Sequence, residues 1–439
     1  MPPATGALTA GATADAPPTN SEDPRGGHPA AGAGRGYLIA LAAASIAVMS
    51  SVLSVAILTL PLKAESIAGG RATTLISVAS GVAGAVALIA NPIFGRLSDR
   101  TTMRWGRRRP YVVLGAVFMA VGSVLVLQAM SVWMLSIGWV LMTMGQISAQ
   151  AALGASIPEQ LAPERRGIAS AVFGVAGTAG ALIGLGLGSL LSPSLPAMIL
   201  APTALAVLTL LVFAVVLRDR PLPSQERPAL VLSEVFGTFW VNPRRHTSYA
   251  LAFGSRFAVF CSIAAVNAYQ AIYLIMGLHI PPTEVAGKIF LASLVSGLTA
   301  LLFAMTMGKL SDRIGRRKPF VVAAALIFAV GLALVATAST FNGFLVAVAV
   351  MGIGQGVYLA VDFALITQVL PDPNNPAKDL GIMNLASSLP NIVVPAVAPA
   401  LLALGASASS PQNFGALFLA GAVAGLLGAV LIAPIRMVR

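Results

Sequence analysis

Two oppositely charged side chains stand inside long apolar stretches of the sequence. Arg256 lies in the stretch 248–276, and Asp362 lies in the stretch 342–369. If both stretches are helices, a rise of about 1.5 Å per residue places Arg256 roughly 12 Å and Asp362 roughly 10 Å from the same end. Because an ionisable group without water is costly unless it is paired, each of the two is a candidate functional residue, and their similar depth would allow them to pair. A static pair, or two groups that reach an aqueous interface, are the alternatives.

Uncharged hydrogen-bonding side chains form a second candidate site. Amides and hydroxyls act as donors and acceptors at once, so a cavity lined by them suits a sugar or another polyol. The alternative is that they join helices to one another, at about 0.6 to 2 kcal/mol each. The predicted lining consists of Gln146, Gln150, Asn267, Tyr269, Gln270, Tyr358, Asn384 and Asn391.

The sequence offers little for enzymatic or metal chemistry. Cys261 is the single cysteine, and only three histidines occur. No nucleophile stands in a pattern with a base and an acid, no cluster suggests metal ligands, and no Gly-rich phosphate loop is present. We therefore expect a protein that is not an enzyme and that has neither a cofactor nor a metal.

The elements that position these residues are membrane helices. Of the 439 residues, 57% are apolar and 10% are charged, and the mean hydropathy is +0.87. Since a bilayer core about 30 Å thick requires about 20 apolar residues per helix, the sequence predicts an all-α membrane protein with 12 transmembrane helices in two six-helix bundles. The expected spans are 37–60, 74–95, 110–130, 133–156, 167–190, 196–217, 248–276, 285–307, 319–338, 342–369, 380–404 and 412–435.

Composition divides the rest of the chain. Residues 1–35 are rich in Ala, Gly, Pro and Thr and predict a disordered cytosolic tail. The N-terminal bundle is expected over 36–217, a cytosolic linker over 218–247 and the C-terminal bundle over 248–439. The positive charges follow this division, because 23 of the 27 lysines and arginines fall on one side of the expected spans. The positive-inside rule then predicts that both termini are cytosolic.

The two bundles repeat one loop. After the second span the chain reads GRLSDR, five residues, and then GRRRP; after the eighth span it reads GKLSDR, one residue, and then GRRKP. The first copy is four residues longer. Parallel repeats of six helices are typical of secondary transporters whose two halves rock about a site near the membrane midplane.

On this duplicated loop the chain resembles the major facilitator superfamily, whose signature is G-x-x-x-D-R followed by a basic run. The resemblance implies a transporter that works by alternating access, with the loops at its cytosolic gate. In this superfamily helices 7 and 10 line the central cavity, so the resemblance also implies that Arg256 and Asp362 form an ion pair that is made and broken during the cycle. Carboxylates at the gate would approach the N-termini of helices 11 and 5, whose free N–H groups favour negative charge; alternatively, the basic loops only fix the topology. The expected gate residues are Gly95, Asp99, Arg100, Arg107, Gly308, Asp312, Arg313 and Arg316.

The finer resemblance is to the glycoside-pentoside-hexuronide:cation symporters and the sucrose-proton symporters. It is carried by the longer first copy of the loop, from Ser98 to Pro110, by Ser255-Arg256-Phe257, and by Val361-Asp362 followed by Leu370-Pro371 and Ala377-Lys378-Asp379-Leu380-Gly381. Drug-proton antiporters typically carry an arginine within helix 4 and a Gly-Pro pair in helix 5, and this chain has neither. We therefore expect proton-coupled transport of a small sugar-like solute across the cytoplasmic membrane, by a monomer with no nucleic-acid partner. Proton-driven efflux of a drug-like or metabolite compound is the alternative.

Overall fold

A computed structural model describes residues 34–219, 242–315, 317–371, 376–406 and 412–435. Residues 1–33 of the predicted tail and 220–241 of the predicted linker lie outside the described residues, as do Arg316 and the side chain of Asp312.

The first set of helices follows the expected order. The first pass begins as α1 and continues through a π-helical turn, η1, into α2. The elements are α1 (Arg35–Ser54), η1 (Val55–Thr59), α2 (Leu60–Ala68), η2 (Gly69–Arg71), α3 (Ala72–Arg100), α4 (Arg109–Gln128), α5 (Val132–Gln160), α6 (Pro163–Leu190) and α7 (Leu195–Val216).

The second set repeats the pattern. Its first helix, α9, also ends in a π-helical turn, η4, and the eleventh expected span is divided at Leu389, because Pro390 starts a new helix. The elements are α9 (Thr247–Ile272), η4 (Tyr273–Gly277), α10 (Pro282–Ile314), α11 (Lys318–Thr337), α12 (Phe341–Gln368), α13 (Pro376–Ser388), α14 (Pro390–Ala403) and α15 (Phe414–Ile432).

Helices in the described part of the chain are long and apolar enough to cross a membrane repeatedly. Eleven continuous stretches qualify, and the first, Arg35–Arg100, contains two passes. The chain reverses between them at Gly69, which has a φ of 47°, and α2 then packs against α3. The prediction of an all-α fold with twelve membrane helices is therefore confirmed.

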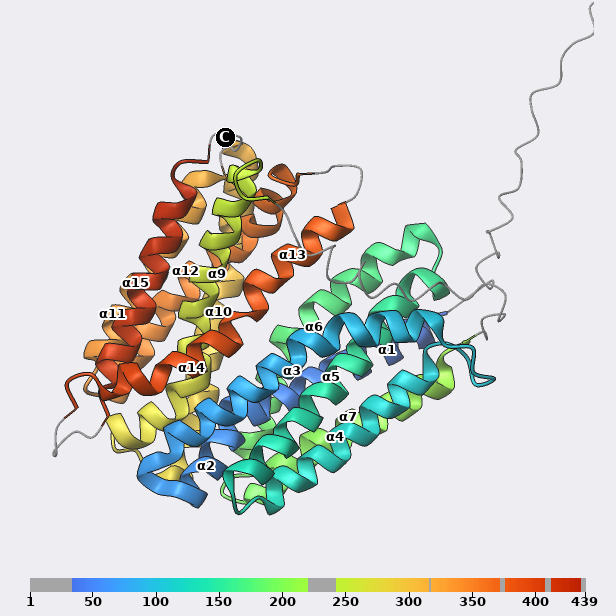
Figure 1. Cartoon of the computed structure of the whole chain (residues 1–439), viewed down its shortest axis with the longest axis horizontal. Helices are drawn as coiled ribbons and strands as arrows, with labels where there is room; N and C mark the ends of the chain where they lie inside the picture. The colour runs from blue at the N-terminus through green and yellow to red at the C-terminus, as the bar shows by residue number, and fades with distance from the viewer. Residues whose placement is uncertain (1–33, 220–241, 316, 372–375, 407–411, 436–439) are drawn as a thin grey trace, which may run out of the picture.

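The two sets meet at one end of the molecule and diverge toward the other (Figure 1). We call the end that holds the loop 101–108 and the start of α11 the basic end. Helix α3 packs against α14, and α6 packs against α10. Hydrogen bonds between the sets join Ser77 Oγ to the Tyr269 hydroxyl at 2.7 Å and Gln412 Nε2 to the Gly70 carbonyl at 3.0 Å. Both contacts lie toward the end opposite the basic loops, so this arrangement is closed there.

Close packing within the first set depends on glycine. A Cβ placed on Gly184 of α6 would lie 2.2 Å from the Ser50 carbonyl oxygen of α1, whereas a Cβ on Gly174 of the same helix would meet nothing within 4 Å. Because the obstacle is backbone, a side chain at Gly184 requires the two helices to separate.

We expect Gly184→Ala to lower the free energy of unfolding by about 1–3 kcal/mol, the usual cost of overpacking. Gly174→Ala is the matched control and should be neutral or slightly stabilising, because alanine favours a helix. Thermal unfolding of both variants in the same detergent measures the difference. Equal midpoints would contradict the proposed helix contact.

Candidate functional site

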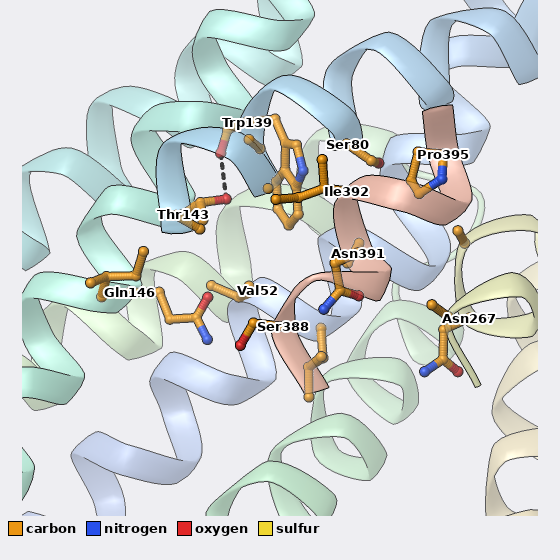
Figure 2. A pocket seen from close by; sticks show the side chains of 18 of the residues that line it. Val52, Ser80, Trp139, Thr143, Gln146, Asn267, Ser388, Asn391, Ile392 and Pro395 are labelled. Carbon is orange, nitrogen blue, oxygen red and sulfur yellow. Dashed lines mark hydrogen bonds between the residues drawn. The ribbon is translucent and has the colours of Figure 1, made fainter. Parts of the chain in front are cut away.

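A cavity of about 370 Å³ lies between the two sets of helices, around the middle of their length (Figure 2). The lining comes from both sets: α1, η1, α3 and α5 contribute from the first, and α9, α13 and α14 from the second. Its polar members are Ser80, Asn91, Trp139, Thr143, Gln146, Gln150, Asn267, Ser388 and Asn391.

One face of α5 supplies a continuous polar wall. Trp139, Thr143, Gln146 and Gln150 recur every three or four residues, so they lie above one another on the helix. The Thr143 hydroxyl donates a hydrogen bond to the Trp139 carbonyl at 2.9 Å, which leaves its lone pairs toward the cavity. This wall presents an indole ring and two amides to a solute.

The second set supplies the opposite wall. Asn391 and Ser388 flank the break between α13 and α14, and Asn267 reaches the cavity from α9 (Figure 2). The backbone comes close here, because a Cβ on Gly84 of α3 would lie 2.7 Å from the Ile392 side chain. The contact between α3 and α14 therefore borders the cavity directly.

A second cavity of about 260 Å³ lies on the other side of the contact between η1 and α9. It shares Leu53, Ile57 and Asn267 with the first, so Asn267 faces both. Gln270 and Gln355 are among its polar residues. In the part of the chain that the structure describes, no charged side chain lines either cavity.

Five of the predicted lining residues are brought to these cavities, namely Gln146, Gln150, Asn267, Gln270 and Asn391. The other three lie elsewhere. Tyr269 is fully buried and bridges the sets through Ser77, Tyr358 is buried beside Asp362, and Asn384 is exposed on α13. For Tyr269, the structure favours the helix-joining role that was its alternative. Tyr358 contacts Asp362 one turn away on its own helix, α12.

Sequence reasoning missed several lining residues. Trp139 and Thr143 could have been found by extending the spacing of Gln146 and Gln150 back by two turns of the same helix. Asn91 stands beside Pro92 in α3, a helix whose polar residues were not considered. No sequence pattern indicates Ser388, because its position at the cavity depends on the break between α13 and α14 at Pro390.

The two intramembrane charges form a pair. Arg256 Nη1 of α9 lies 2.6 Å from Asp362 Oδ2 of α12, and both side chains are nearly buried. The Tyr358 hydroxyl, one turn before Asp362, donates to the same carboxylate. The Arg256 guanidinium also lies over the Phe260 ring, 5.3 Å from its centroid, and its Nε has no hydrogen-bond partner. Contacts with Tyr358 and Phe260 therefore hold the pair, and the Nε–H of Arg256 remains an unused hydrogen-bond donor.

The first basic loop forms a second charged network. Arg108 is 4% exposed, and its Nη2 lies 2.7 Å from Asp99 Oδ1 and 2.5 Å from Glu159 Oε1. Arg107 pairs with Glu159 as well. Burial lowers the pKa of Arg108, but the bonds to Glu159 and Asp99 outweigh it, so the pKa of this guanidinium is raised. The loop is thus fastened to the end of α5.

The start of α4 is fixed by a carboxylate from another segment. Asp219 Oδ2 accepts hydrogen bonds from the backbone N–H groups of Arg108 at 2.6 Å and Arg109 at 2.8 Å. This caps the helix N-terminus, where unpaired donors and the helix dipole favour negative charge. A Cβ on Gly106, whose φ is 106°, would lie 2.3 Å from the Asp219 carboxyl carbon, so glycine is required there.

The predicted gate residues are divided by these contacts. Asp99 pairs with Arg108 of its own set, so its expected approach to helix 11 stays a prediction for a closed state. Arg107 belongs to the same network, while two nitrogens of Arg100 are buried without a partner. Gly95 has no close neighbour, Gly308 faces Ala360 of α12, and Arg313 is exposed. The Asp312 side chain and Arg316 are outside the description.

Metal chemistry finds no support in the described residues, among which no group of three or more His, Cys, Asp or Glu side chains could hold an ion.

Comparison with known proteins identifies the superfamily. The model of the Major Facilitator Superfamily matches residues 39–304 and 252–439, which together cover nearly the whole chain. Among solved structures, the nucleoside transporter NupG (D323A mutant) aligns with a TM-score of 0.71 and 13% identity over 91% of this chain and 100% of that one. A bacterial homologue of the lysosomal transporter Spinster, inward-facing and unoccupied, aligns with a TM-score of 0.65 and 16% identity, over 90% of this chain and 94% of that one. At these identities the structures support the fold alone.

Curated relatives match a smaller part of the chain. The multidrug resistance protein MdtL of Klebsiella pneumoniae (strain 342) is 33% identical over 152 residues, which are 32% of this chain and 36% of the relative. MdtL of Shewanella oneidensis is 36% identical over 118 residues, or 27% of each chain. The chain thus matches only about a third of these relatives' length.

We expect Asp362→Asn to lower the free energy of unfolding by about 3–5 kcal/mol, because it leaves the Arg256 guanidinium buried without its counterion. The neutral pair Arg256→Gln/Asp362→Asn should recover part of that loss. Thermal unfolding in detergent measures both.

Lys288→Gln is the control, since Lys288 is partly exposed, pairs with the exposed Glu284 at 3.6 Å and lies over the Phe341 ring, and these contacts together should contribute about 1–2 kcal/mol at most. An Asp362→Asn variant as stable as Lys288→Gln would show that water screens the buried pair.

Proposed function

Because the chain belongs to the Major Facilitator Superfamily, we propose that this membrane transporter moves a small uncharged polar solute by alternating access. The observation that carries the proposal is the central cavity, which is lined from both sets of helices and has no charged side chain among its described residues. An ion placed there would find no counterion. A solute held from both sides would be released when the two sets move relative to one another.

The lining favours a solute with several hydroxyls. Gln146, Gln150, Asn267 and Asn391 each offer an acceptor and two donors, which can match neighbouring hydroxyls of a sugar or polyol. Trp139 adds a flat apolar surface with one N–H donor. A volume of about 370 Å³ is within the usual range for small-molecule sites. The finer resemblance to sugar-cation symporters points to the same substrate class.

We assign proton coupling to Asp362 and Arg256. Protonation of Asp362 would neutralise the carboxylate and release the guanidinium, while deprotonation would restore the pair. Gln355 lines the second cavity and lies two turns before Asp362 on the same helix, so α12 connects the pair to the solute. Binding and protonation would then be linked by displacement of α12 against α9.

The basic loops suit a gate at the cytosolic face. In our proposal the protein is a monomer in the cytoplasmic membrane. Its basic end faces the cytosol, because loops rich in Lys and Arg favour that side of the membrane. The arrangement described here is then open to the cytosol. When the two sets close at the basic end, Asp99 would leave Arg108 and contact the N-terminus of α13. Asp312 would in the same way contact the N-terminus of α6.

Efflux of a drug-like or metabolite compound is the second candidate function. It is favoured by the two relatives that are named multidrug resistance proteins. Apolar residues such as Val52, Leu88 and Ile147 also line the central cavity and could contact an apolar compound. The missing helix 4 arginine and helix 5 Gly-Pro pair weigh against an antiporter of the usual pattern.

Proton symport predicts that the medium outside energy-starved cells becomes alkaline when the substrate is added. We expect this response for one member of a panel of sugars and polyols, and its loss in the neutral double variant Arg256→Gln/Asp362→Asn. A pH electrode measures it. If the panel gives no signal while cells accumulate less of a hydrophobic dye in an energy-dependent manner, efflux replaces uptake as the function.

Asn391 and Asn384 form a matched pair for locating the cavity. Asn391→Leu should raise the KM for the transported solute about tenfold or more, since one buried amide contact is lost and its partner left unpaired. Asn384→Leu, on an exposed site outside both linings, should leave KM unchanged. Initial rates of radiolabelled uptake give both values, and equal KM values for the two variants would place the solute elsewhere.

A further inference from the structure

A hollow on the outer surface of the first set is separate from the central cavities. It has a volume of about 480 Å³ and lies where the first basic loop meets α4. Met103, Arg104 and Trp105 form its loop side, while Pro110, Val113 and Val117 form its helix side. Met103 is 59% exposed and Trp105 is 72% exposed, so large apolar side chains stand open at this point.

Arg104 differs from the other arginines of the run. Arg107 and Arg108 pair with Glu159, and Arg109 donates to the Leu217 carbonyl at 2.5 Å. Arg104 is exposed and makes no ion pair with any residue that the structure describes. A cation at the rim of an otherwise apolar hollow therefore has no counterion among the described residues.

The hollow continues along the membrane-facing side of α4. Val117, Val121 and Val124 are about half exposed and follow one another at helical spacing down that side. A tryptophan and an arginine beside such a strip match the interfacial region of a bilayer, where headgroups lie above the acyl chains. A hydrocarbon chain can follow the valines while its headgroup stays at the loop.

We propose that this hollow is a binding site for one anionic phospholipid. The phosphate headgroup pairs with Arg104, the ring of Trp105 lies at the level of the glycerol backbone, and an acyl chain runs along Val113 and Val117. Basic hollows between membrane helices are suited to anionic headgroups. A zwitterionic lipid such as phosphatidylcholine offers the same phosphate, but its own ammonium group offsets that charge and is repelled by Arg104. A soluble phosphate would leave the apolar side of the hollow uncovered.

The site is specific to the first copy of the repeated loop. That copy is four residues longer than the second, and the additional length holds Met103, Arg104 and Trp105. The same loop carries Arg108, whose contacts to Asp99 and Glu159 fasten α3 to α5. A bound lipid therefore contacts the loop that we assign to the gate, although the binding itself does not depend on that assignment.

The test is lipid retention. The full chain is reconstituted in vesicles of equal phosphatidylglycerol and phosphatidylcholine and extracted in mild detergent, and mass spectrometry quantifies the retained lipids. We expect phosphatidylglycerol to be enriched over the mixture, and Arg104→Gln to reduce the enrichment about fivefold, as expected for one arginine near an anionic headgroup. Trp105→Ala should also reduce it.

Two control variants sit at the opposite end of the molecule. Arg71 is exposed there, and Trp133 is 72% exposed, as Trp105 is. Arg71→Gln and Trp133→Ala should retain the enrichment, and excess soluble glycerol phosphate should not displace the lipid. The proposal is overturned if the wild type shows no enrichment, if Arg104→Gln keeps it in full, if the control variants lose it equally, or if glycerol phosphate displaces the lipid.

Discussion

Hydrocarbon surrounds most of this molecule, and it determines where a charged side chain can be placed. In hydrocarbon a charge must have a partner or reach an interface, and three arginines illustrate that constraint. Arg256 is paired with Asp362 inside the bundle, and Arg108 is buried only because Asp99 and Glu159 surround it. Arg104, for which the described part of the chain supplies no ion-pair partner, stands at the surface, where a lipid can supply one. Charge in this protein is thus placed by the availability of counterions.

The same constraint separates the solute from the ion pair. Neither Arg256 nor Asp362 belongs to the described lining of the two cavities, so a solute does not compete with the carboxylate for the guanidinium. Coupling then requires movement of the helices that carry both kinds of residue. Helix α9 holds Arg256 and Asn267, and α12 holds Asp362 and Gln355. This favours a conformational link between proton and solute over direct contact between them.

Features with a regular period were predictable from the sequence, and features that depend on contacts between distant segments were not. Apolar runs located the membrane helices, because span length is imposed by the bilayer. Five of the eight predicted lining residues reach a cavity, but Trp139 was missed because residues were chosen by type and not by helical face. The capping of α4 by Asp219 joins segments more than a hundred residues apart, and no local pattern indicates it.

The two sets of helices have diverged in where they hold charge, and this bears on how the transporter can work. In the internal repeat Gly154 corresponds to Asp362, and a Cβ there would make an ordinary contact of 3.5 Å with the Phe173 ring of α6. Glycine at this position leaves the first set without an equivalent acid, and the charged network of that set lies in the loop before α4 instead. A coupling step based on Asp362 acts within the second set alone. The first set would then contribute the polar wall of α5, which includes Gln146, and the gate. Protonation of Asp362 would affect solute contacts on α5 through movement of the two sets relative to one another.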